Sequence, residues 1–275
     1  MNKKMILDTN LLPEQAALYY LGQVGLLIQF RGKFILVDGY LSDSVDRMSA
    51  GGPVVWKRNY PWPVRPSELD FVDYVFCTHA HTDHADPDTL SAIAAVNRKA
   101  RFFGPAPVCE ILPGFGVPKD RIELIRADET MKLDDDISVR AIPAAHEELH
   151  PDGEGSYEEL GYIFSLDDLK VYHSGDCCPY DGLIERVKGC DAALMPINGK
   201  DYFRTNVQNI IGCFDSVEAI TIAKEAGIGV LLPGHFDLYN CNMVNPAYFV
   251  DCIQRIAPGQ KYHIFQPGER YILQK

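Results

Sequence analysis

Residues 78–86 read Thr-His-Ala-His-Thr-Asp-His-Ala-Asp, so four possible metal ligands fall within six positions. The run before them, residues 71–77, is short, aromatic and β-branched, which predicts a buried strand. We expect a loop at the end of this strand to carry His79, His81, Asp83 and His84. Three imidazoles and a carboxylate so close together favour a borderline divalent cation. The alternative is an exposed polar turn, which gives no reason for three histidines.

The composition is that of a globular chain, with 275 residues and 47% hydrophobic side chains. This length buries a large core, and without a linker or repeat the sequence predicts one domain over residues 1–275. The formal net charge is -12, from 26 basic and 38 acidic side chains. Such a charge disfavours nucleic acid and anionic membranes as partners unless the site is locally positive, and metal ions would supply that positive charge.

The eight cysteines are scattered and form no Cys-x-x-Cys pair, which is typical of free thiols in a reducing compartment. Asp8 stands where a signal peptide needs its apolar region, and no apolar segment is long enough to span a bilayer. The sequence therefore predicts a cytoplasmic protein with no membrane partner.

Short apolar runs separated by turn residues predict a strand-rich chain. Expected strands cover residues 17–22, 25–30, 33–38, 71–77, 101–104, 121–125, 137–142, 161–166, 170–173, 192–196, 230–232, 262–265 and 271–273. Expected helices cover residues 89–97, 106–112, 182–188, 217–226 and 247–256. Predicted turns lie at 31–32, 167–168 and 267–268, and Asp215 with Glu218 has capping-box spacing. Strands followed by helices in both halves favour an α+β class, with sheet packed on sheet and helices outside.

Residues 39–68 interrupt this pattern. Four prolines forbid long regular elements there, and Trp56, Tyr60 and Trp62 are interleaved with them. A loop this long within a compact domain is usually functional or forms an assembly surface. Its aromatic side chains can cover a site, pack on a partner subunit or anchor the loop, and the sequence leaves these three roles open.

Three further residues share one layout, in which an apolar strand and a turn residue precede a possible ligand. They are His146, Asp176 and His235, which follow residues 141–145, 171–175 and 230–234. A single histidine after a strand is more often structural than a ligand. Because the layout is repeated, however, we expect all three side chains at the same sheet edge as residues 79–84.

The motif His79-x-His81-x-Asp83-His84, followed by His146, Asp176 and His235, resembles the metallo-β-lactamase fold superfamily in the order and spread of seven ligands over nearly the whole chain. Within it, the chain is similar to the L-ascorbate-6-phosphate lactonase branch of metal-dependent hydrolases. Residues 20–25, 115–121 and 172–176 carry this narrower similarity. Residues 233–237 depart from it, since they hold one histidine where the lactonase has two adjacent ones. This departure concerns the substrate rather than the metal site.

The resemblance implies a four-layer αββα sandwich with the site at one edge, between the sheets. It also implies two divalent metal ions per chain, Mn²⁺ or Zn²⁺. The first would be bound by His79, His81 and His146, the second by Asp83, His84 and His235, and Asp176 would bridge them. A metal-bridging hydroxide would then attack a carbonyl or phosphorus centre, with Asp83 as a catalytic residue that orients the water and passes its proton on.

Other histidines and cysteines lie near these motifs. His150 follows the same strand as His146 but falls within a turn, so His146 is the favoured ligand. His173 lies inside a strand and is expected to support the bridging carboxylate or to pack. Cys177 and Cys178 follow that carboxylate and are alternative soft ligands, although a complete set of imidazoles and carboxylates favours packing roles for them.

The loop after the strand at residues 192–196 is the predicted substrate-binding segment. Asn198 is a candidate catalytic residue because its amide can donate to an oxyanion. Lys200 and Arg204 can pair with a substrate phosphate or carboxylate, and Tyr202 is a further candidate. The alternative is a solvated loop whose cations pair with neighbouring Asp and Glu side chains.

We therefore hypothesise a metal-dependent hydrolase that acts on a small anionic molecule, with a lactone or another cyclic ester as first choice. The alternative enzyme is a phosphodiesterase acting on a nucleotide or another phosphodiester, although the chain carries no basic tract. A non-catalytic metal- or metabolite-binding protein is the alternative outside enzymes, and the complete ligand set argues against it. The resemblance also implies a homo-oligomer.

Overall fold

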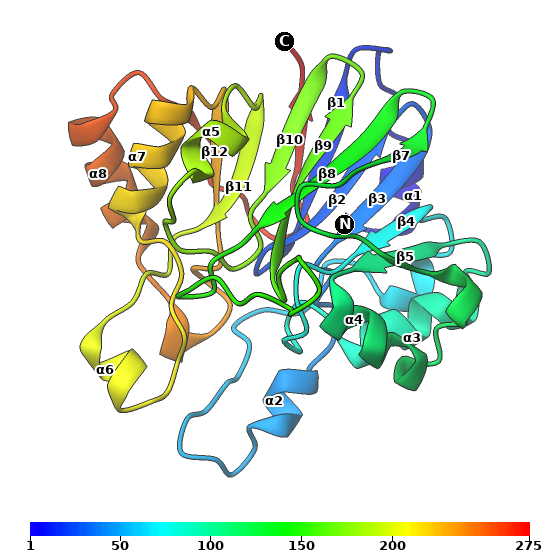
Figure 1. Ribbon diagram of the computed structural model, residues 1–275, viewed down its shortest axis with the longest axis horizontal. Coiled ribbons are helices and arrows are strands. Elements are labelled where there is room, and N and C mark those ends of the chain that lie inside the picture. The colour runs from blue at the N-terminus through cyan, green and yellow to red at the C-terminus, as the bar shows by residue number, and fades with distance from the viewer.

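The computed structural model describes residues 1–275 and contains two mixed β-sheets packed face to face (Figure 1). In spatial order, the first sheet comprises β14 (Arg270–Leu273), β1 (Ala16–Gly22), β2 (Gly25–Phe30), β3 (Lys33–Val37), β4 (Tyr74–Phe76), β5 (Arg101–Gly104) and β6 (Ile122–Leu124). The second comprises β13 (Lys261–Tyr262), β12 (Val230–Gly234), β11 (Ala192–Pro196), β10 (Leu169–His173), β9 (Leu160–Leu166), β8 (Ile137–Pro143) and β7 (Thr130–Asp134).

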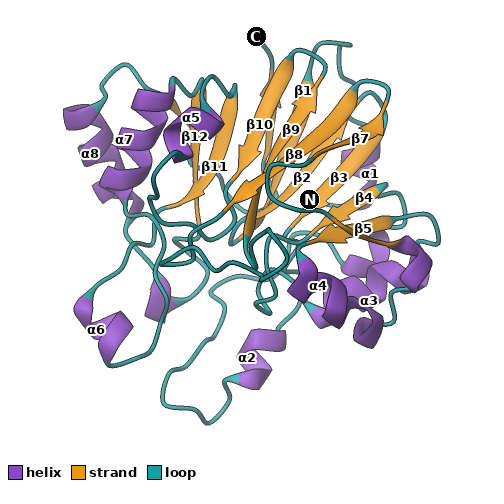
Figure 2. Ribbon diagram, viewed as in Figure 1, coloured by secondary structure: helices purple, strands orange, loops and turns teal.

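Helices cover the outer face of each sheet, which completes the four layers (Figure 2). On the first sheet lie α1 (Lys3–Leu7), α3 (Pro87–Val96) and α4 (Ala106–Ile111). On the second lie α5 (Leu183–Val187), α7 (Ser216–Ala226) and α8 (Pro246–Ile256). The predicted αββα sandwich is confirmed. None of the helices combines the length and the apolar character needed to cross a membrane.

The central strands are buried on both faces. Every residue of β1 and β2 is buried, because one face meets the core between the sheets and the other meets the helices. Such strands read as continuous apolar runs in the sequence, which is why they were predictable. The turn between β2 and β3 has positive φ angles at Arg31 and Gly32, as a two-residue hairpin with the usual strand twist requires.

Caps position the helices next to the site. The Asp86 side chain accepts hydrogen bonds from the backbone N–H groups of Asp88 and Thr89 and so starts α3 directly after the histidine-rich loop. The predicted capping box at the start of α7 is confirmed, with Asp215 accepting from Glu218 N at 2.8 Å and Glu218 accepting from Asp215 N at 3.0 Å.

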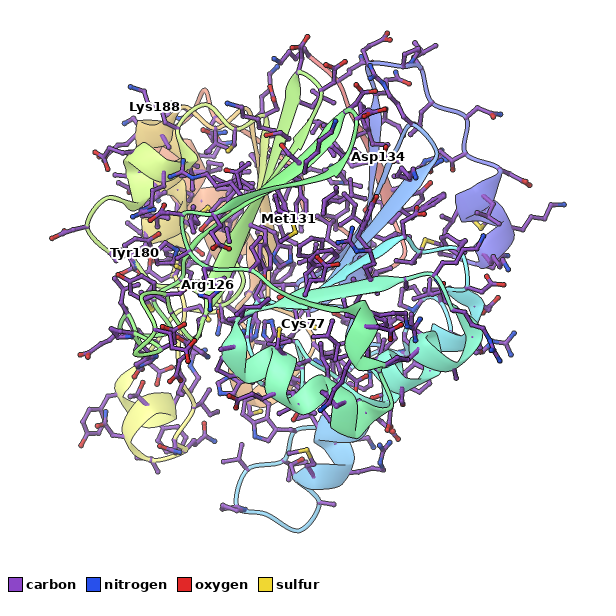
Figure 3. All side chains as sticks on the ribbon, turned by 45° about the vertical axis from the view of Figure 1, so that its right-hand side comes forward. Cys77, Arg126, Met131, Asp134, Tyr180 and Lys188 are labelled. Carbon is purple, nitrogen blue, oxygen red and sulfur yellow. The ribbon has the colours of Figure 1, made fainter.

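Several short elements were not predicted. Helices α1, α2 (Ser44–Met48) and α6 (Tyr202–Asn206) have five residues each, too few to show a helical period. Figure 1 shows that α2 and α6 project beyond the sheets, on either side of the edge where the loops gather. Strand β7 was missed because most of its side chains are polar or exposed. Only its apolar residues reach the core; Met131 packs there, whereas Asp134 pairs with Lys33 at 2.8 Å (Figure 3).

The last two strands do not form the pair that the sequence suggested. Strand β13 covers only two residues and runs parallel to β12, whereas β14 runs antiparallel to β1 in the other sheet. The segment between them crosses from sheet to sheet, and the Phe265 ring stacks on Tyr20 with centroids 5.3 Å apart. Burial of this ring between the sheets accounts for the apolar run that we interpreted as a strand over residues 262–265.

Candidate metal centre and substrate pocket

All seven predicted ligands converge at one edge of the sandwich. The loop after β4 carries His79, His81, Asp83 and His84, while turns after β8, β10 and β12 carry His146, Asp176 and His235. The first group comes from one sheet and the second group from the other. The site therefore lies where the carboxyl ends of strands from both sheets meet. Most of these side chains are buried, with His81 exposed at the mouth and Asp83 partly exposed.

Three imidazoles face one point. The Nδ1 atom of His81 lies 3.0 Å from His79 Nε2 and 3.1 Å from His146 Nε2. A proton on one nitrogen can form a hydrogen bond within only one of these pairs at a time. A metal ion between the rings would bind the lone pairs of all three nitrogens. Burial holds the pKa of His79 well below its usual value and lowers the pKa of His146 to about 4. Both rings are therefore neutral at pH 7, the form that binds metals.

A second group joins Asp83, His84 and His235. The Asp83 Oδ2 atom lies 3.7 Å from His84 Nε2 and 3.6 Å from His235 Nε2. Asp176 lies between the groups, because its Oδ1 is 3.4 Å from His84 Nε2 and its Oδ2 is 3.2 Å from His235 Nε2. Asp176 also forms a possible ligand set with His146 of the first group. His79, His84 and Asp176 form a further possible set that crosses the two triads, so the assignment of the ligands to two ions stays a prediction.

The residues present fit divalent metal ions. The buried atoms His84 Nε2 and Asp176 Oδ1 lie 3.4 Å apart but form no hydrogen bond, and an unsatisfied buried polar atom costs about 1–3 kcal/mol. Burial lowers the pKa of His84, but the carboxylates of Asp176 and Asp83 outweigh it and hold this pKa well above its usual value. The carboxylates thus favour positive charge here, which a metal ion would provide together with the missing bonds.

Asp38, at the end of β3, was missed as a functional residue. Its carboxylate is fully buried and accepts hydrogen bonds from His84 Nδ1 at 2.8 Å and from Thr78 Oγ1 at 2.7 Å. The bond to Nδ1 orients the ring so that His84 Nε2 faces the other ligands, as supporting carboxylates do in metal sites. The sequence pattern that indicated Asp176, an acidic residue at the end of an apolar strand, also occurs at Asp38 and could have indicated it.

Gln23 was also missed, although it lies in the motif at residues 20–25. It occupies the turn between β1 and β2 with φ +58°, an uncommon conformation for a residue with a side chain. Its Nε2 atom lies 2.8 Å from Asp83 Oδ2 and 2.8 Å from His235 Nε2. Its backbone oxygen accepts from the His235 N–H at 2.6 Å. This turn therefore holds two ligands from opposite sheets.

The remaining histidines have structural partners. His150 pairs with Glu159 at 3.1 Å and is exposed, so the structure brings His146 rather than His150 to the other ligands. His173 donates to the Val24 carbonyl at 2.8 Å and accepts from Gly175 N at 3.1 Å, which secures the turn before Asp176. This is one of the two roles predicted for His173.

The cysteines next to Asp176 do not join the ligand sets. The thiols of Cys177 and Cys178 donate to the backbone carbonyls of Cys178 and Gly212. The sulfur that does approach the ligands belongs to Cys213, which lies within 4.8 Å of the ligand atoms of His146 and Asp176. No local pattern around residue 213 indicated this, because the segment reaches the site only through the tertiary fold.

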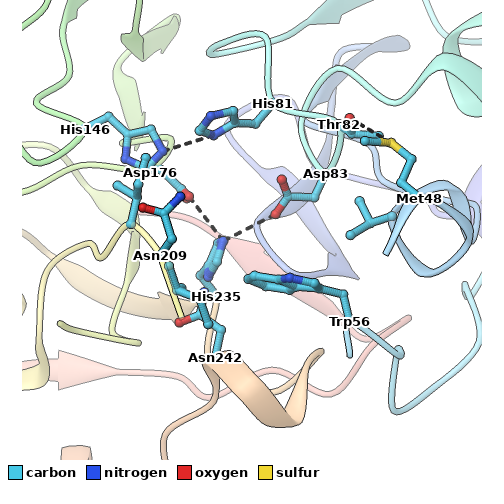
Figure 4. Close-up of a pocket in the computed structure, with 13 residues that line it drawn as sticks. Met48, Trp56, His81, Thr82, Asp83, His146, Asp176, Asn209, His235 and Asn242 are labelled. Carbon is cyan, nitrogen blue, oxygen red and sulfur yellow. Dashed lines mark hydrogen bonds and ion pairs between the residues drawn. The ribbon is translucent and has the colours of Figure 1, made fainter. Parts of the chain in front are cut away.

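A cavity of about 340 Å³ opens above the ligands (Figure 4). Its floor consists of His81, Asp83, His146, Asp176 and His235. Its walls consist of Val45, Met48, Trp56, Thr82, Asn209, Ile210, Ile211 and Asn242. The segment 39–68 thus covers the site, one of the roles left open for it. The Trp56 ring also packs edge-on against Tyr239, with centroids 5.3 Å apart, which anchors this wall.

Asn198 does not line the cavity. It is buried behind Asn242, and its Nδ2 donates to Asn242 Oδ1 at 3.1 Å. Arg204 Nη1 donates to the same oxygen at 3.0 Å. Because an arginine can only donate, the Asn242 oxygen must face it, and the Asn242 amide N–H₂ is the end left for a ligand. The amides on the cavity wall are therefore those of Asn209 and Asn242, and Asn198 contacts Asn242 from behind; a catalytic role for Asn198 stays a prediction.

The other predicted substrate-binding residues also lie off the cavity wall. Lys200 Nζ lies 3.5 Å from Cys178 Sγ. Tyr202 is 78% exposed on α6. Arg204 pairs with Asp201 and reaches the cavity only through Asn242. The geometry places none of these side chains where a substrate on the floor would contact it directly.

Comparison with known proteins places this site in a family. Residues 34–236 match the family model described as beta-lactamase superfamily domain. A protein named UPF0173 metal-dependent hydrolase, from Caldivirga maquilingensis, is 24% identical over 92% of this chain and 96% of its own length. A probable L-ascorbate-6-phosphate lactonase from Salmonella heidelberg is 24% identical over 78% of this chain and 64% of its own.

Solved structures agree on the fold. The isothiocyanate hydrolase from Delia radicum gut bacteria superimposes with a TM-score of 0.74 at 18% sequence identity, covering 94% of this chain and all of that one. The family model spans more than half of the chain, and its limits include every predicted metal ligand. This chain therefore belongs to the beta-lactamase superfamily and has the metallo-β-lactamase fold.

Proposed function

We propose that the protein is a metal-dependent hydrolase that binds two divalent ions, Mn²⁺ or Zn²⁺, and cleaves a small ester, with a lactone or another cyclic ester as first choice. One observation carries this proposal: two ligand triads, with Asp176 between them, form the floor of a cavity of substrate size. The names of the curated relatives, metal-dependent hydrolase and probable lactonase, support it. Bound divalent ions would lower the pKa of a coordinated water to about 7 and polarise the bond to be cleaved.

Asp83 is the proton carrier in this proposal. Its Oδ2 is held by Gln23 Nε2 at 2.8 Å and faces His84 and His235, so Oδ1 is the atom free to act in the cavity. Asp83 Oδ1 accepts a proton from the attacking water and delivers it to the leaving oxygen. The Asn242 amide, held by Asn198 and Arg204, donates to the carbonyl oxygen as negative charge develops there.

The test compares metal content with turnover. Protein loaded with Mn²⁺ or Zn²⁺ is assayed on a panel of lactones, and bound metal is counted by elemental analysis. Asp83→Asn is expected to lower kcat by about 10²–10⁴-fold, and His84→Ala to lower the metal count. His150→Ala is the matched control, because His150 pairs with Glu159 outside the cavity. Two bound metals without hydrolysis of any ester would overturn the proposal.

The phosphodiesterase alternative has no specific observation in its favour, because no Lys or Arg lines the cavity. Cytoplasmic location and homo-oligomerisation stay predictions. The eight free cysteines support the first, and the exposed apolar side chains of Tyr202, Phe203 and Val207 support the second. Light scattering of the purified protein measures its assembly.

A further inference from the structure

The cavity has apolar walls that come from two distant parts of the chain. Val45, Met48 and Trp56 form one wall, and Ile210 and Ile211 belong to the segment after α6. Figure 4 shows Met48 and Trp56 beside Asp83 and His235, so this wall begins at the edge of the ligand floor. Met48 is 71% exposed and Ile211 is 41% exposed. Large apolar side chains left open to solvent around a cavity are typical of a surface that receives a ligand.

The arginines on the wall-forming segments are paired elsewhere, and Lys57, next to Trp56, is exposed and does not line the cavity. Arg47 pairs with Asp43 and Asp88, away from the cavity. Arg58 donates to the Ser42 and Tyr60 carbonyls and lies over the rings of Tyr40 and Trp62. Arg204 pairs with Asp201. A phosphate or carboxylate against these walls would lose its water without gaining a charged partner, which is costly.

Positive charge is therefore confined to the floor, where the metal ions would be held among two carboxylates and five imidazoles. The floor is where the bond to be cleaved must lie. The rest of the substrate extends along walls whose only polar side chains are Thr82, Asn209 and Asn242, all uncharged. The floor thus favours a polar group that can be cleaved, and the walls favour an uncharged, apolar remainder of the same substrate.

We infer that the substrate is an uncharged ester or lactone with a short alkyl or aryl substituent, and that this substituent lies between Met48, Trp56 and Ile210. The inference depends on the proposed function in one respect only, namely that the bond to be cleaved lies at the floor of the cavity. We prefer it to the anionic substrate expected from the sequence, because Lys200 and Arg204, the candidate partners for such a charge, do not line the cavity. Asn242 remains the polar contact for the carbonyl.

Binding can be measured without turnover. The chain has two tryptophans, so a Trp62→Phe background leaves Trp56 as the only indole reporter while keeping a ring beneath Arg58. Metal-loaded protein is titrated with γ-lactams that carry alkyl chains of increasing length, and with the same compounds ending in a carboxylate. We expect Trp56 fluorescence to change and Kd to fall about fourfold per added methylene until the cavity is full. The carboxylated series is expected to bind at least about tenfold more weakly than the neutral series, because its charge is desolvated without a partner.

A charge introduced on the wall gives a second test. In Met48→Lys the preference is expected to reverse, so that carboxylated lactams bind more tightly than neutral ones. Val55→Lys is the matched control, because Val55 lies in the same loop and is 69% exposed but does not line the cavity. It should leave the preference for neutral compounds unchanged.

The outcomes separate this inference from the proposed function. Equal or tighter binding of the carboxylated series to the parent protein, or a Kd independent of chain length, would overturn the apolar substrate class. Chain-length-dependent binding of neutral lactams without hydrolysis of the matching lactones would support the substrate class and overturn the reaction. Hydrolysis with kcat/KM rising in parallel with chain length would support both.

Discussion

His84 uses its two ring nitrogens for different tasks. Nδ1 donates to the buried Asp38 carboxylate at 2.8 Å, and Nε2 faces Asp83 and Asp176. Asp38 touches no other candidate ligand, so its effect on the site passes through His84 and through Thr78, whose N–H donates to Asp38 at 2.8 Å. A residue outside the ligand set therefore decides the direction in which a ligand points.

Asp38→Asn is expected to weaken metal binding about 10–100-fold, because the amide cannot reproduce the carboxylate's bonds to His84 and Thr78. Competition with a chromogenic chelator measures this affinity. Asp73→Asn is the matched control, since the Asp73 carboxylate also accepts from a backbone N–H, that of Phe34 at 2.9 Å, but lies away from the site. Equal metal affinity in both variants would contradict the supporting role of Asp38.

Gly175→Ala tests the close approach that positions Asp176. A Cβ at Gly175 would lie 2.7 Å from Thr78 Cβ, and φ is +60°. We expect the free energy of unfolding to fall by about 1–3 kcal/mol and the metal count to fall as the turn shifts. Gly189→Ala has a similar φ of +71° with nothing within 4 Å, so it measures the backbone strain alone. Retention of both metals in Gly175→Ala would show that Asp176 tolerates a displaced turn.

At the scale of elements, the segment 39–68 is attached to the site by Tyr60. Its hydroxyl donates to Asp237 Oδ1 at 2.7 Å, two residues after His235. Its ring lies against Gly22, where an added Cβ would approach to 2.8 Å. One side chain thus joins the covering segment, the Gln23 turn and the turn after β12. Together with the packing of Trp56 on Tyr239, this contact holds in place a segment that has almost no regular structure.

Tyr60→Phe is expected to lower the free energy of unfolding by about 1–3 kcal/mol, because the partly buried Asp237 carboxylate loses the hydrogen bond from the Tyr60 hydroxyl. Urea denaturation measures this change, and Trp56 fluorescence anisotropy reports loosening of the wall. Tyr202→Phe, at an exposed tyrosine of α6, is the control and should alter neither quantity. An unchanged stability in Tyr60→Phe would mean that water replaces the hydroxyl without cost.

Sequence reasoning succeeded where one local pattern decides the structure. Buried strands such as β1 read as apolar runs, and a residue that follows a strand is placed by that strand, which is how the positions of His146 and His235 at the sheet edge could be predicted. It failed where the role depends on contacts between distant segments. Gln23 matters because it meets Asp83, and Asn242 because Asn198 and Arg204 orient it. The motif at residues 20–25 singles out the turn that holds Gln23 but not its contact with Asp83, and no local pattern indicates the contacts of Asn242.

At the scale of the whole molecule, the hydrophobic cores and the candidate metal ligands are separate groups of residues. Three hydrophobic cores, one between the sheets and one outside each sheet, contain none of the seven ligands. The two triads lie at the edge of this framework and contribute no apolar packing. The fold thus has its own source of stability, and metal ions that bind the folded state would add to it.

Removal of the metals with a chelator is expected to leave the far-ultraviolet circular dichroism spectrum unchanged and to lower Tm. Free metal at 100 times its Kd would add about 2.7 kcal/mol per site to the free energy of unfolding. Differential scanning calorimetry at several metal concentrations measures this dependence. Loss of secondary structure on chelation would contradict the separation of framework and site.

The order of the ligands along the chain has a consequence for synthesis on the ribosome. The first triad requires residue 146 and the second requires residue 235, while β1 gains its outer neighbour only from residues 270–273. A nascent chain therefore lacks His235 for most of its elongation, so the candidate ligand set is incomplete. During this time its histidine side chains are exposed to the metal ions of the cell. If metal ions bind as we propose, the complete ligand set would form only late in folding, after the second sheet has brought His235 to Asp83.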